Sequence, residues 1–176
     1  MSGAPLWHGA IAFACRAHLG QTRRDGRTPY AAHVVRVAFS LRDEFGVEDE
    51  EILAAAALHD VIEDTPADYD DVAEAFGDRA ARLVATMTKD MRLPEAEREV
   101  LYERGVIDAG RDAWLIKLGD VLDNLRDAAS LDDPARGGRL RGRAERLVAA
   151  IENAGFSDEA VEKGVELVRA AIEALH

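Results

Sequence analysis

This sequence of 176 residues has one cysteine, five prolines and few aromatic residues, which make up 6% of the chain. A single cysteine excludes an intramolecular disulfide bond. The apolar helical pattern around Cys15 predicts that this thiol packs as a small buried side chain. Proline is scarce, whereas alanine, leucine, valine, arginine and glutamate are abundant, so the composition favours helix.

Long apolar runs are also missing. No stretch approaches the roughly 20 residues that a helix needs to cross a bilayer, and residues 1–10 lack the basic and apolar segments of a signal peptide. We therefore expect a cytoplasmic protein that does not bind membranes.

Positive charge is scarce too, with 22 Lys and Arg against 34 Asp and Glu, a net charge of −12 and a pI near 4.8. This balance argues against nucleic-acid binding, which requires a basic face. A local basic cluster can still dominate a pocket, so an anionic small substrate is not excluded.

Apolar residues recur with a helical period along the whole chain. The expected helices span about 4–19, 30–45, 50–64, 68–76, 78–89, 95–105, 112–130, 139–153 and 158–175. Gly46 is expected to end the second helix and Asp49 to cap the third. Breaks are expected at Gly105 and Gly110, and a loop from Asp132 to Gly138. We expect one all-α domain over residues 1–176, a bundle of roughly eight to ten helices.

The last expected helix has a regular apolar stripe along one face, formed by Val161, Val165, Val168, Ile172 and Leu175. This stripe can pack against the core or against another subunit. A homo-oligomer is therefore left open.

The most informative segment runs from Ala56 to Thr65 and carries His59, Asp60, Glu63 and Asp64 within an apolar helical pattern. Buried charge is costly unless it is paired or bound to metal. His59 and Glu63 are four residues apart, as are Asp60 and Asp64, so each pair would share one helical face. An imidazole beside carboxylates suits a divalent metal.

Two further segments carry candidate site residues. Asp120 and Asn124 lie one helical turn apart among leucines, where they can complete a metal site and orient a water. Alternatively, Asp120 pairs with Lys117 and Asn124 caps the helix or faces solvent. His33 precedes an apolar stripe, a position at which a histidine is more often a hydrogen-bonded core residue than a ligand.

Taken together, these segments resemble the HD-domain metal-dependent phosphohydrolases, in particular the RelA/SpoT hydrolase branch and its small stand-alone alarmone hydrolases of the stringent response. The resemblance covers residues from about 14 to 128, followed by C-terminal helices at about 139–175. Its elements occur in order: Ala17–Gln21, Arg23–Gly26, Pro29-Tyr30, His33, Ala57–Thr65, Phe76-Gly77, Thr88-Lys89, Lys117–Asp120 and Asn124–Arg126.

The resemblance implies that His33, His59, Asp60 and Asp120 ligate one divalent metal, usually manganese. It further implies that Glu63 or Asp64 relays a proton, that Asn124 helps to hold the attacking water and the phosphate, and that Arg23 and Arg24 contact the nucleotide. The implied reaction is hydrolysis of guanosine 3′,5′-bis(diphosphate) to GDP and pyrophosphate, or of the pentaphosphate to GTP and pyrophosphate.

Some positions depart from the family pattern. Val121 and Asp123 stand where the long hydrolases often have arginine and histidine, and Asp127 stands where they often have threonine. The first two bear on recognition of the base. The third would place a carboxylate near a polyphosphate unless it points away. A basic run beyond the resemblance, Arg136 to Arg146, either is a solvated helix face or borders the pocket.

Two alternatives remain. One is an HD phosphohydrolase that acts on another phosphorylated nucleotide such as NADPH, with the same metal site. The other is a non-catalytic helical module that keeps the core pattern for stability. Zinc deaminase, zinc protease and P-loop motifs are absent from the sequence.

Overall fold

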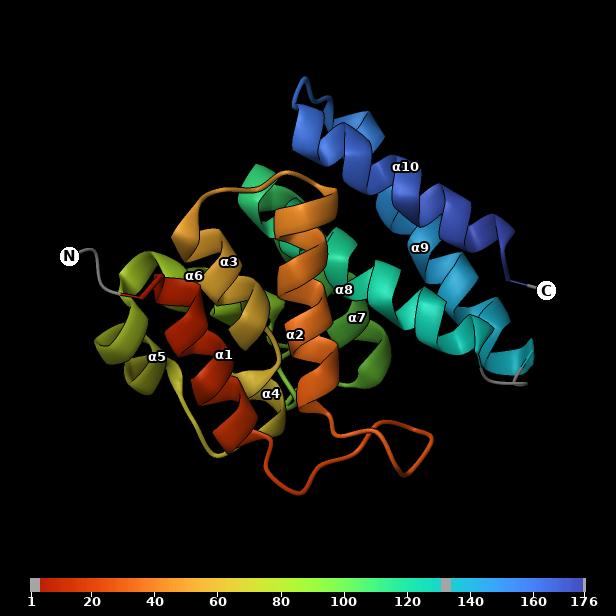
Figure 1. The fold of residues 1–176 in the computed structure, drawn as a ribbon. Coiled ribbons are helices and arrows are strands. Elements are labelled where there is room, and N and C mark those ends of the chain that lie inside the picture. Colours follow the sequence, from red (N-terminus) through yellow and green to blue (C-terminus); the bar gives the residue numbers. More distant parts are fainter. Residues whose placement is uncertain (1–3, 131–133, 176) are drawn as a thin grey trace.

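The computed structural model describes residues 4–130 and 134–175. Over these residues the chain forms ten α-helices and one short π-helical segment, η1 (Figure 1). Their bounds are α1 Leu6–Ala17, α2 Ala31–Phe39, η1 Ser40–Glu44, α3 Glu50–Leu58, α4 Val61–Asp64, α5 Tyr69–Phe76, α6 Asp78–Met87, α7 Glu95–Asp108, α8 Arg111–Ala129, α9 Pro134–Ala154 and α10 Glu159–Glu173. The expected all-α class is confirmed, and an isolated bridge between Thr22 and Pro29 is the sole β-type pairing among the described residues.

Helices α3 and α8 form the centre of the molecule. Helix α3 is buried from Ile52 to Leu58 because it is apolar on all sides. Helices α1, α5 and α6 lie on one side of this centre, and α9 and α10 run together along α8 on the other (Figure 1). Helix α2 crosses between α3 and α8, and this crossing brings His33 close to both.

The expected start of α3 is confirmed. The Asp49 carboxylate accepts hydrogen bonds from the backbone N–H groups of Glu51 (3.0 Å) and Ile52 (3.2 Å), which fills the role of a helix N-cap. Gly46 has a φ of +79° and ends the preceding helical stretch, as expected for a residue without a Cβ. The register of α3, and therefore the position of His59, is set at this junction.

The expected helix 50–64 is wrong in one respect, because it is interrupted at His59-Asp60. Asp60 has φ −101° and ψ −1°, and a new four-residue helix, α4, begins after it. Adjacent residues of a regular helix point about 100° apart. The break removes this constraint, so the two side chains meet at one point. The stacking of His59 over Glu63 on one regular helical face is therefore not observed.

Four smaller expectations also differ. Gly105 lies within α7, and Gly137 and Gly138 lie within α9, because a helix tolerates an interior glycine at a cost of about 1 kcal/mol. The end of the second helix is wound as the π-helical η1. Cys15 is exposed rather than buried, because it lies on the outer face of α1. Asp132 and Asp133 lie outside the described residues.

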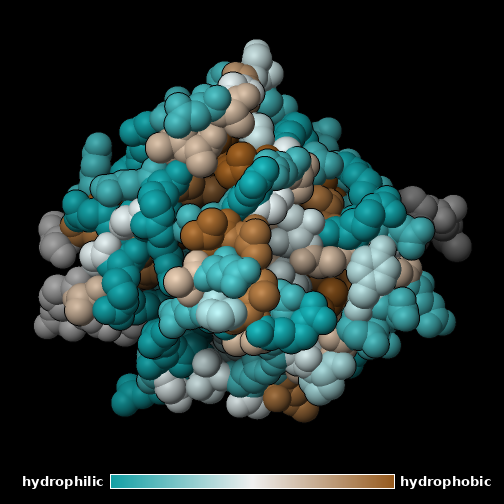
Figure 2. Space-filling view, turned by 180° about the vertical axis from the view of Figure 1, so that it is seen from behind, coloured by the Kyte–Doolittle hydropathy of each residue, from teal (hydrophilic) through white to brown (hydrophobic). Residues whose placement is uncertain are grey.

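The surface seen from the side opposite to Figure 1 is largely hydrophilic, with hydrophobic residues gathered near the middle of the face (Figure 2). Within the described part of the chain, no helix combines the length and the apolar character required to span a membrane.

Candidate active site

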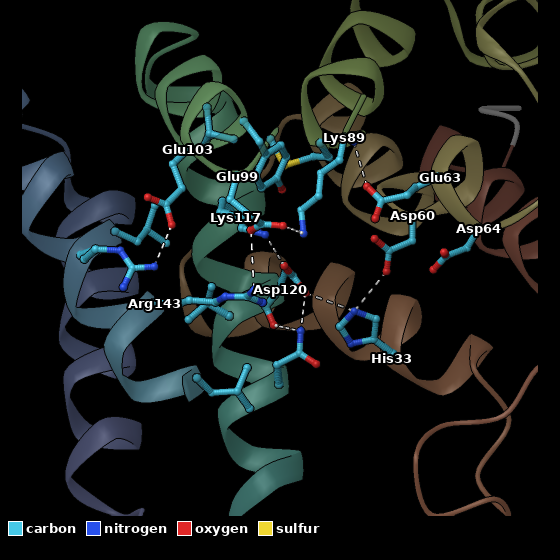
Figure 3. A pocket seen from close by; sticks show the side chains of 18 of the residues that line it. His33, Asp60, Glu63, Asp64, Lys89, Glu99, Glu103, Lys117, Asp120 and Arg143 are labelled. Carbon is cyan, nitrogen blue, oxygen red and sulfur yellow. Dashed lines mark hydrogen bonds and ion pairs between the residues drawn. The ribbon is translucent and has the colours of Figure 1, made fainter. Parts of the chain in front are cut away.

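A pocket of about 260 Å³ opens where α2, α4, α7, α8 and α9 converge. Figure 3 shows His33, Asp60 and Asp64 on one side of it, Asp120 in the middle, and Glu103 and Arg143 on the opposite side. The pocket therefore joins the N-terminal segments that carry histidines to the C-terminal helices.

Two buried imidazoles, of which His33 lines the pocket, lie edge to face with their ring planes 71° apart. The Nε2 atoms of His33 and His59 are 3.2 Å apart, and the two residues are 1% and 2% exposed. The Nδ1 atom of His59 lies 2.8 Å from the Ala56 carbonyl oxygen. Because a carbonyl only accepts, Nδ1 carries a proton, and Nε2 is the nitrogen that faces the neighbouring groups and would bind a cation once deprotonated.

Two carboxylates complete the cluster, Asp60 next to His59 in the chain and Asp120 on α8. Asp60 Oδ2 lies 3.1 Å from His59 Nε2 and 3.5 Å from His33 Nε2. Asp120 Oδ1 lies 3.3 Å from His33 Nε2 and 3.8 Å from His59 Nε2. Ligand atoms that bind one ion at about 2.1 Å are themselves separated by roughly 3.0–3.5 Å. The spacing and the mixed nitrogen and oxygen donors fit a divalent cation.

Each carboxylate of the cluster also accepts a hydrogen bond from a neighbouring side chain. The Tyr30 hydroxyl donates to Asp60 Oδ2 at 2.5 Å, and Asn124 Nδ2 donates to Asp120 Oδ1 at 2.6 Å. Lys117 Nζ donates to the other oxygen of Asp120 at 2.8 Å. The pairing of Asp120 with Lys117 and its place in the cluster therefore coexist rather than exclude one another.

The histidines and carboxylates shift each other's pKa values strongly. Burial alone would lower the pKa of His33, but hydrogen bonds to Asp120, Asp123 and Asp60 raise it to about 9. Burial alone would raise the pKa of Asp60, but His59 and His33 hold it well below its usual value. The cluster thus concentrates anionic oxygen atoms that a cation can neutralise.

Glu63 and Asp64 line the pocket beside this cluster. Glu63 is half-buried and accepts a hydrogen bond from the Lys89 backbone N–H at 2.9 Å. Its burial raises its pKa above the ordinary value of 4.5. Asp64 is more exposed, and its backbone carbonyl accepts from Gln21 Nε2 at 2.7 Å. Both carboxyl groups are therefore placed at the edge of the cluster, where a proton can be exchanged with solvent.

The two neighbouring arginines that were expected to contact substrate lie in different environments. Arg23 is 9% exposed and lines the pocket, and its guanidinium donates to Asn124 Oδ1 at 2.9 Å and to Asp127 at 3.0 Å. Arg24 is exposed and does not line the pocket. Of the two, Arg23 alone is brought to the predicted site.

The basic run was expected either to be a solvated helix face or to border the pocket, and Arg143 and Arg146 do line it, whereas the acidic residues Glu99 and Glu103 of this far wall were not predicted. Arg143 lies 3.7 Å from Glu99, and Arg146 lies 2.9 Å from Glu103. These residues line the pocket where α9 packs against α7. The acidic pair is four residues apart and the basic pair three apart, spacings that place each on one helical face. Nothing local in the sequence indicates that the two faces meet.

Other basic residues of α9 point elsewhere. Arg141 donates to the Leu175 carbonyl oxygen at 2.5 Å, and Arg139 is exposed. Within the basic run of α9, Arg143 and Arg146 therefore line the pocket, Arg141 contacts the end of the chain after α10, and Arg139 faces solvent.

The three residues that depart from the family pattern, Val121, Asp123 and Asp127, lie in different surroundings. Val121 lines the pocket, whereas Asp123 and Asp127 line a second depression that includes Arg36. Asp127 does not line the pocket itself, and its carboxylate is paired with Arg23, which does.

Comparison with known proteins shows the family to which the chain belongs. The HD domain family model matches residues 10–146. A human protein named guanosine-3′,5′-bis(diphosphate) 3′-pyrophosphohydrolase MESH1 is 43% identical over 119 residues, which cover 67% of this chain and 66% of that protein. Its counterpart from Drosophila melanogaster is 42% identical over 118 residues, 66% of each chain. The match thus spans about two thirds of the length of these curated relatives.

A solved structure described as a metazoan ortholog of SpoT that hydrolyzes ppGpp superposes with a TM-score of 0.80. The two are 31% identical in sequence, and the superposition covers 97% of both chains. The family model covers well over half of this sequence, and the shared fold extends over nearly all of it. The chain belongs to the HD domain family.

Proposed function

We propose that this chain is a metal-dependent 3′-pyrophosphohydrolase of guanosine 3′,5′-bis(diphosphate) and its pentaphosphate analogue. The observation that carries the proposal is the convergence of His33, His59, Asp60 and Asp120 beside Glu63 in one pocket. The names of the relatives support the choice of substrate, since those proteins are described as guanosine-3′,5′-bis(diphosphate) 3′-pyrophosphohydrolases.

The donor set supports binding of one divalent cation by His33, His59, Asp60 and Asp120, and we propose Mn(II) as that ion. Imidazole nitrogens mixed with carboxylate oxygens are consistent with manganese, iron or zinc, and the resemblance to the RelA/SpoT branch favours manganese among these. When bound, such a cation lowers the pKa of a coordinated water and neutralises phosphate charge. Cytoplasmic location, the single-domain organisation and a possible homo-oligomer stay predictions.

The side chains around the cluster would carry the remaining work of hydrolysis. Glu63 or Asp64 takes the proton of the attacking water or returns one to the leaving oxygen, since both line the pocket beside the cluster. Asn124, held between Asp120 and Arg23, is placed to orient the water and a phosphate oxygen. The raised pKa of Glu63 brings it closer to neutral pH, which favours proton exchange.

Basic side chains lining the pocket would bind the phosphates in spite of the net charge of −12. Arg23, Lys89, Arg143 and Arg146 all line the pocket, and Arg143 lies on the side opposite to His33 (Figure 3). Guanidinium forks suit phosphate oxygens, and a local basic lining can outweigh the field of the whole protein. Arg24, exposed beside the pocket, would act at longer range.

In the proposed reaction, water attacks the phosphorus atom that is bonded to the 3′ oxygen of the ribose. A bond forms between the water oxygen and phosphorus, and the bond from phosphorus to the 3′ oxygen breaks. The 3′ oxygen receives a proton, and pyrophosphate leaves. The tetraphosphate thereby yields GDP, and the pentaphosphate yields GTP.

The test is release of pyrophosphate from guanosine tetraphosphate by the full chain with and without added Mn(II). We expect turnover that requires Mn(II) and is lost in His59→Ala and in Glu63→Ala. His8→Ala is a matched control, because His8 is exposed on α1, and it should retain activity.

Two results would count against the proposal. Mn(II) binding at His59 without turnover would keep the metal site and direct the search to other phosphorylated nucleotides such as NADPH. Absence of Mn(II) binding by the wild type would contradict a metal-dependent enzyme and favour a non-catalytic helical module.

A further inference from the structure

Asp123 lies behind His33, on the side away from the pocket. Its Oδ2 atom is 2.6 Å from His33 Nδ1, and the two residues are 5% and 1% exposed. The two positions are 90 residues apart in the sequence and come together where α8 packs against α2.

Arg36 holds this carboxylate in place from α2. Its Nε atom donates to Asp123 Oδ1 at 2.5 Å, and a second guanidinium nitrogen donates to Oδ2 at 2.9 Å. Arg36 follows His33 by three positions, so the two side chains leave one helical face and meet the same carboxylate. A bidentate arginine fixes both the position and the plane of a carboxylate.

This geometry determines which nitrogen of His33 carries a proton. An ionised carboxylate only accepts hydrogen bonds, so Nδ1 must donate to Asp123. Nε2 then faces Asp60, Asp120 and His59, and it is the nitrogen that would give up its proton and bind a cation. In His59 the proton on Nδ1 is fixed by a backbone carbonyl, that of Ala56, whereas in His33 it is fixed by a side chain.

We propose that Asp123 and Arg36 form a positioning pair that fixes the orientation and tautomer of His33 for metal binding. The inference rests on the proposed function, because it assigns His33 as a ligand of the catalytic cation. Partners that bind the second nitrogen of a ligand histidine typically change metal affinity by about 10- to 100-fold when they are removed.

Packing alone does not require this arrangement. A carboxylate that is 5% exposed carries a desolvation cost, and an apolar residue could join α2 to α8 without it. What an apolar residue cannot do is accept a hydrogen bond from Nδ1 and raise the basicity of the ring. Both members of the pair, Arg36 and Asp123, line the second depression, where α2 and η1 meet α8.

The test is calorimetric titration of the metal-free full chain with MnCl₂, without nucleotide. Asp123→Asn is isosteric, but its NH₂ group must face either His33 Nδ1 or Arg36, which are both donors. We expect it to weaken Mn(II) binding about 10- to 100-fold.

The matched control is Asp127→Asn, the same change one turn along α8. Asp127 also contacts Arg23 and Arg36, yet it has no contact with His33, so Mn(II) affinity should change less than about threefold.

Two further readouts separate positioning from general stability. Far-UV circular dichroism and thermal melting should show that Asp123→Asn is folded. In the pyrophosphate assay, kcat should recover toward the wild-type value as Mn(II) is raised above the new Kd, since the proton-transfer groups are untouched.

A folded Asp123→Asn that binds Mn(II) as tightly as wild type would overturn the inference. If that variant does not fold, Arg36→Gln tests the same relationship, because it removes the guanidinium and keeps the carboxylate. Unchanged Mn(II) affinity in Arg36→Gln would then overturn it. Failure of the wild type to hydrolyse the nucleotide, with Mn(II) affinity still dependent on Asp123, would instead refute the proposed substrate and leave the positioning role supported.

Discussion

Lys117 and Asp120 form the ion pair that balances the acidic side of the pocket, with Nζ 2.8 Å from Oδ2. The lysine precedes the aspartate by three positions on α8, so one turn of helix delivers both charges. Burial would lower the pKa of Lys117, but Asp120 raises it. The lysine therefore stays cationic and partly neutralises the cluster from which the metal site would be built.

Replacing the Lys117 ammonium should lower the stability of the fold, because the acidic cluster then lacks its neighbouring positive charge. We expect Lys117→Met to lower the free energy of unfolding by about 1–3 kcal/mol in EDTA, because Asp120 loses its partner in a mostly buried setting. Added Mn(II) should then raise Tm more in the variant than in wild type, since the site is more negative. Denaturant titration with EDTA or Mn(II) measures both effects. Lys163→Met, at an exposed position of α10, should change stability by less than about 0.5 kcal/mol, and an equal loss in both variants would contradict the prediction.

The ionised Glu63 carboxylate should lower the stability of the fold at neutral pH, although hydrolysis requires this residue. Burial, with smaller contributions from Asp60 and Asp64, raises its folded-state pKa above 4.5. Folding therefore favours the protonated carboxyl. The stabilisation is complete below about pH 4.5 and is lost as pH rises through the higher folded-state pKa.

Glu63→Gln removes this penalty and keeps an oxygen acceptor for the Lys89 N–H. In EDTA we expect the Tm of the variant to equal that of wild type near pH 4.5 and to exceed it by about 2–4 °C near pH 7.5, while pyrophosphate release is lost. Thermal melting at the two pH values measures this difference. Glu97→Gln, at an exposed position of α7, should show no such pH dependence, and a variant that melts below wild type at pH 7.5 would refute the argument.

Local patterns in the sequence were enough to predict most of the helices. The grouping of His33, His59, Asp60 and Asp120 was implied by the family resemblance instead, since the local pattern alone favoured His33 as a core residue. The helix boundaries follow from capping at Asp49 and from glycines such as Gly46, which act within a few residues. The break at His59-Asp60 was not predictable, because the apolar pattern continues through it and the energy that favours it comes from contacts with α2 and α8.

Contacts between distant helices account for what was missed. The pairing of Glu103 with Arg146 depends on how α7 meets α9, and the contact of Asp123 with His33 depends on how α8 meets α2. A single sequence shows each helical face but not which faces pack together. It also presented Arg23 and Arg24 as equivalent, whereas the loop buries one and exposes the other.

This difference gives a prediction about substrate binding. Arg23→Ala should raise KM for guanosine tetraphosphate about 10- to 100-fold, because a charge-assisted hydrogen bond in a buried setting contributes about 1.5–3 kcal/mol. Arg24→Ala should raise KM only a few-fold, because an exposed charge acts through solvent, and this increase should disappear at high salt. Steady-state kinetics at low and high ionic strength measure both variants. Equal, salt-independent increases would show that Arg24 also reaches the substrate directly.

Gly119 sets the close approach of α8 to α2 and η1, and therefore the distance from Asp120 to His33. A Cβ at this position would overlap Leu41 Cδ1 and lie 3.2 Å from Val37 Cγ1. We expect Gly119→Ala to destabilise the fold by about 1–3 kcal/mol through overpacking and to weaken Mn(II) binding by pushing the two helices apart. Gly105→Ala is the matched control, because a Cβ there meets nothing within 4 Å, and it should stabilise the fold by about 0.5–1 kcal/mol. Denaturant titration and Mn(II) calorimetry on both variants measure these effects. A Gly119→Ala protein with wild-type stability and Mn(II) affinity would show that α2 and α8 can separate without disturbing the cluster.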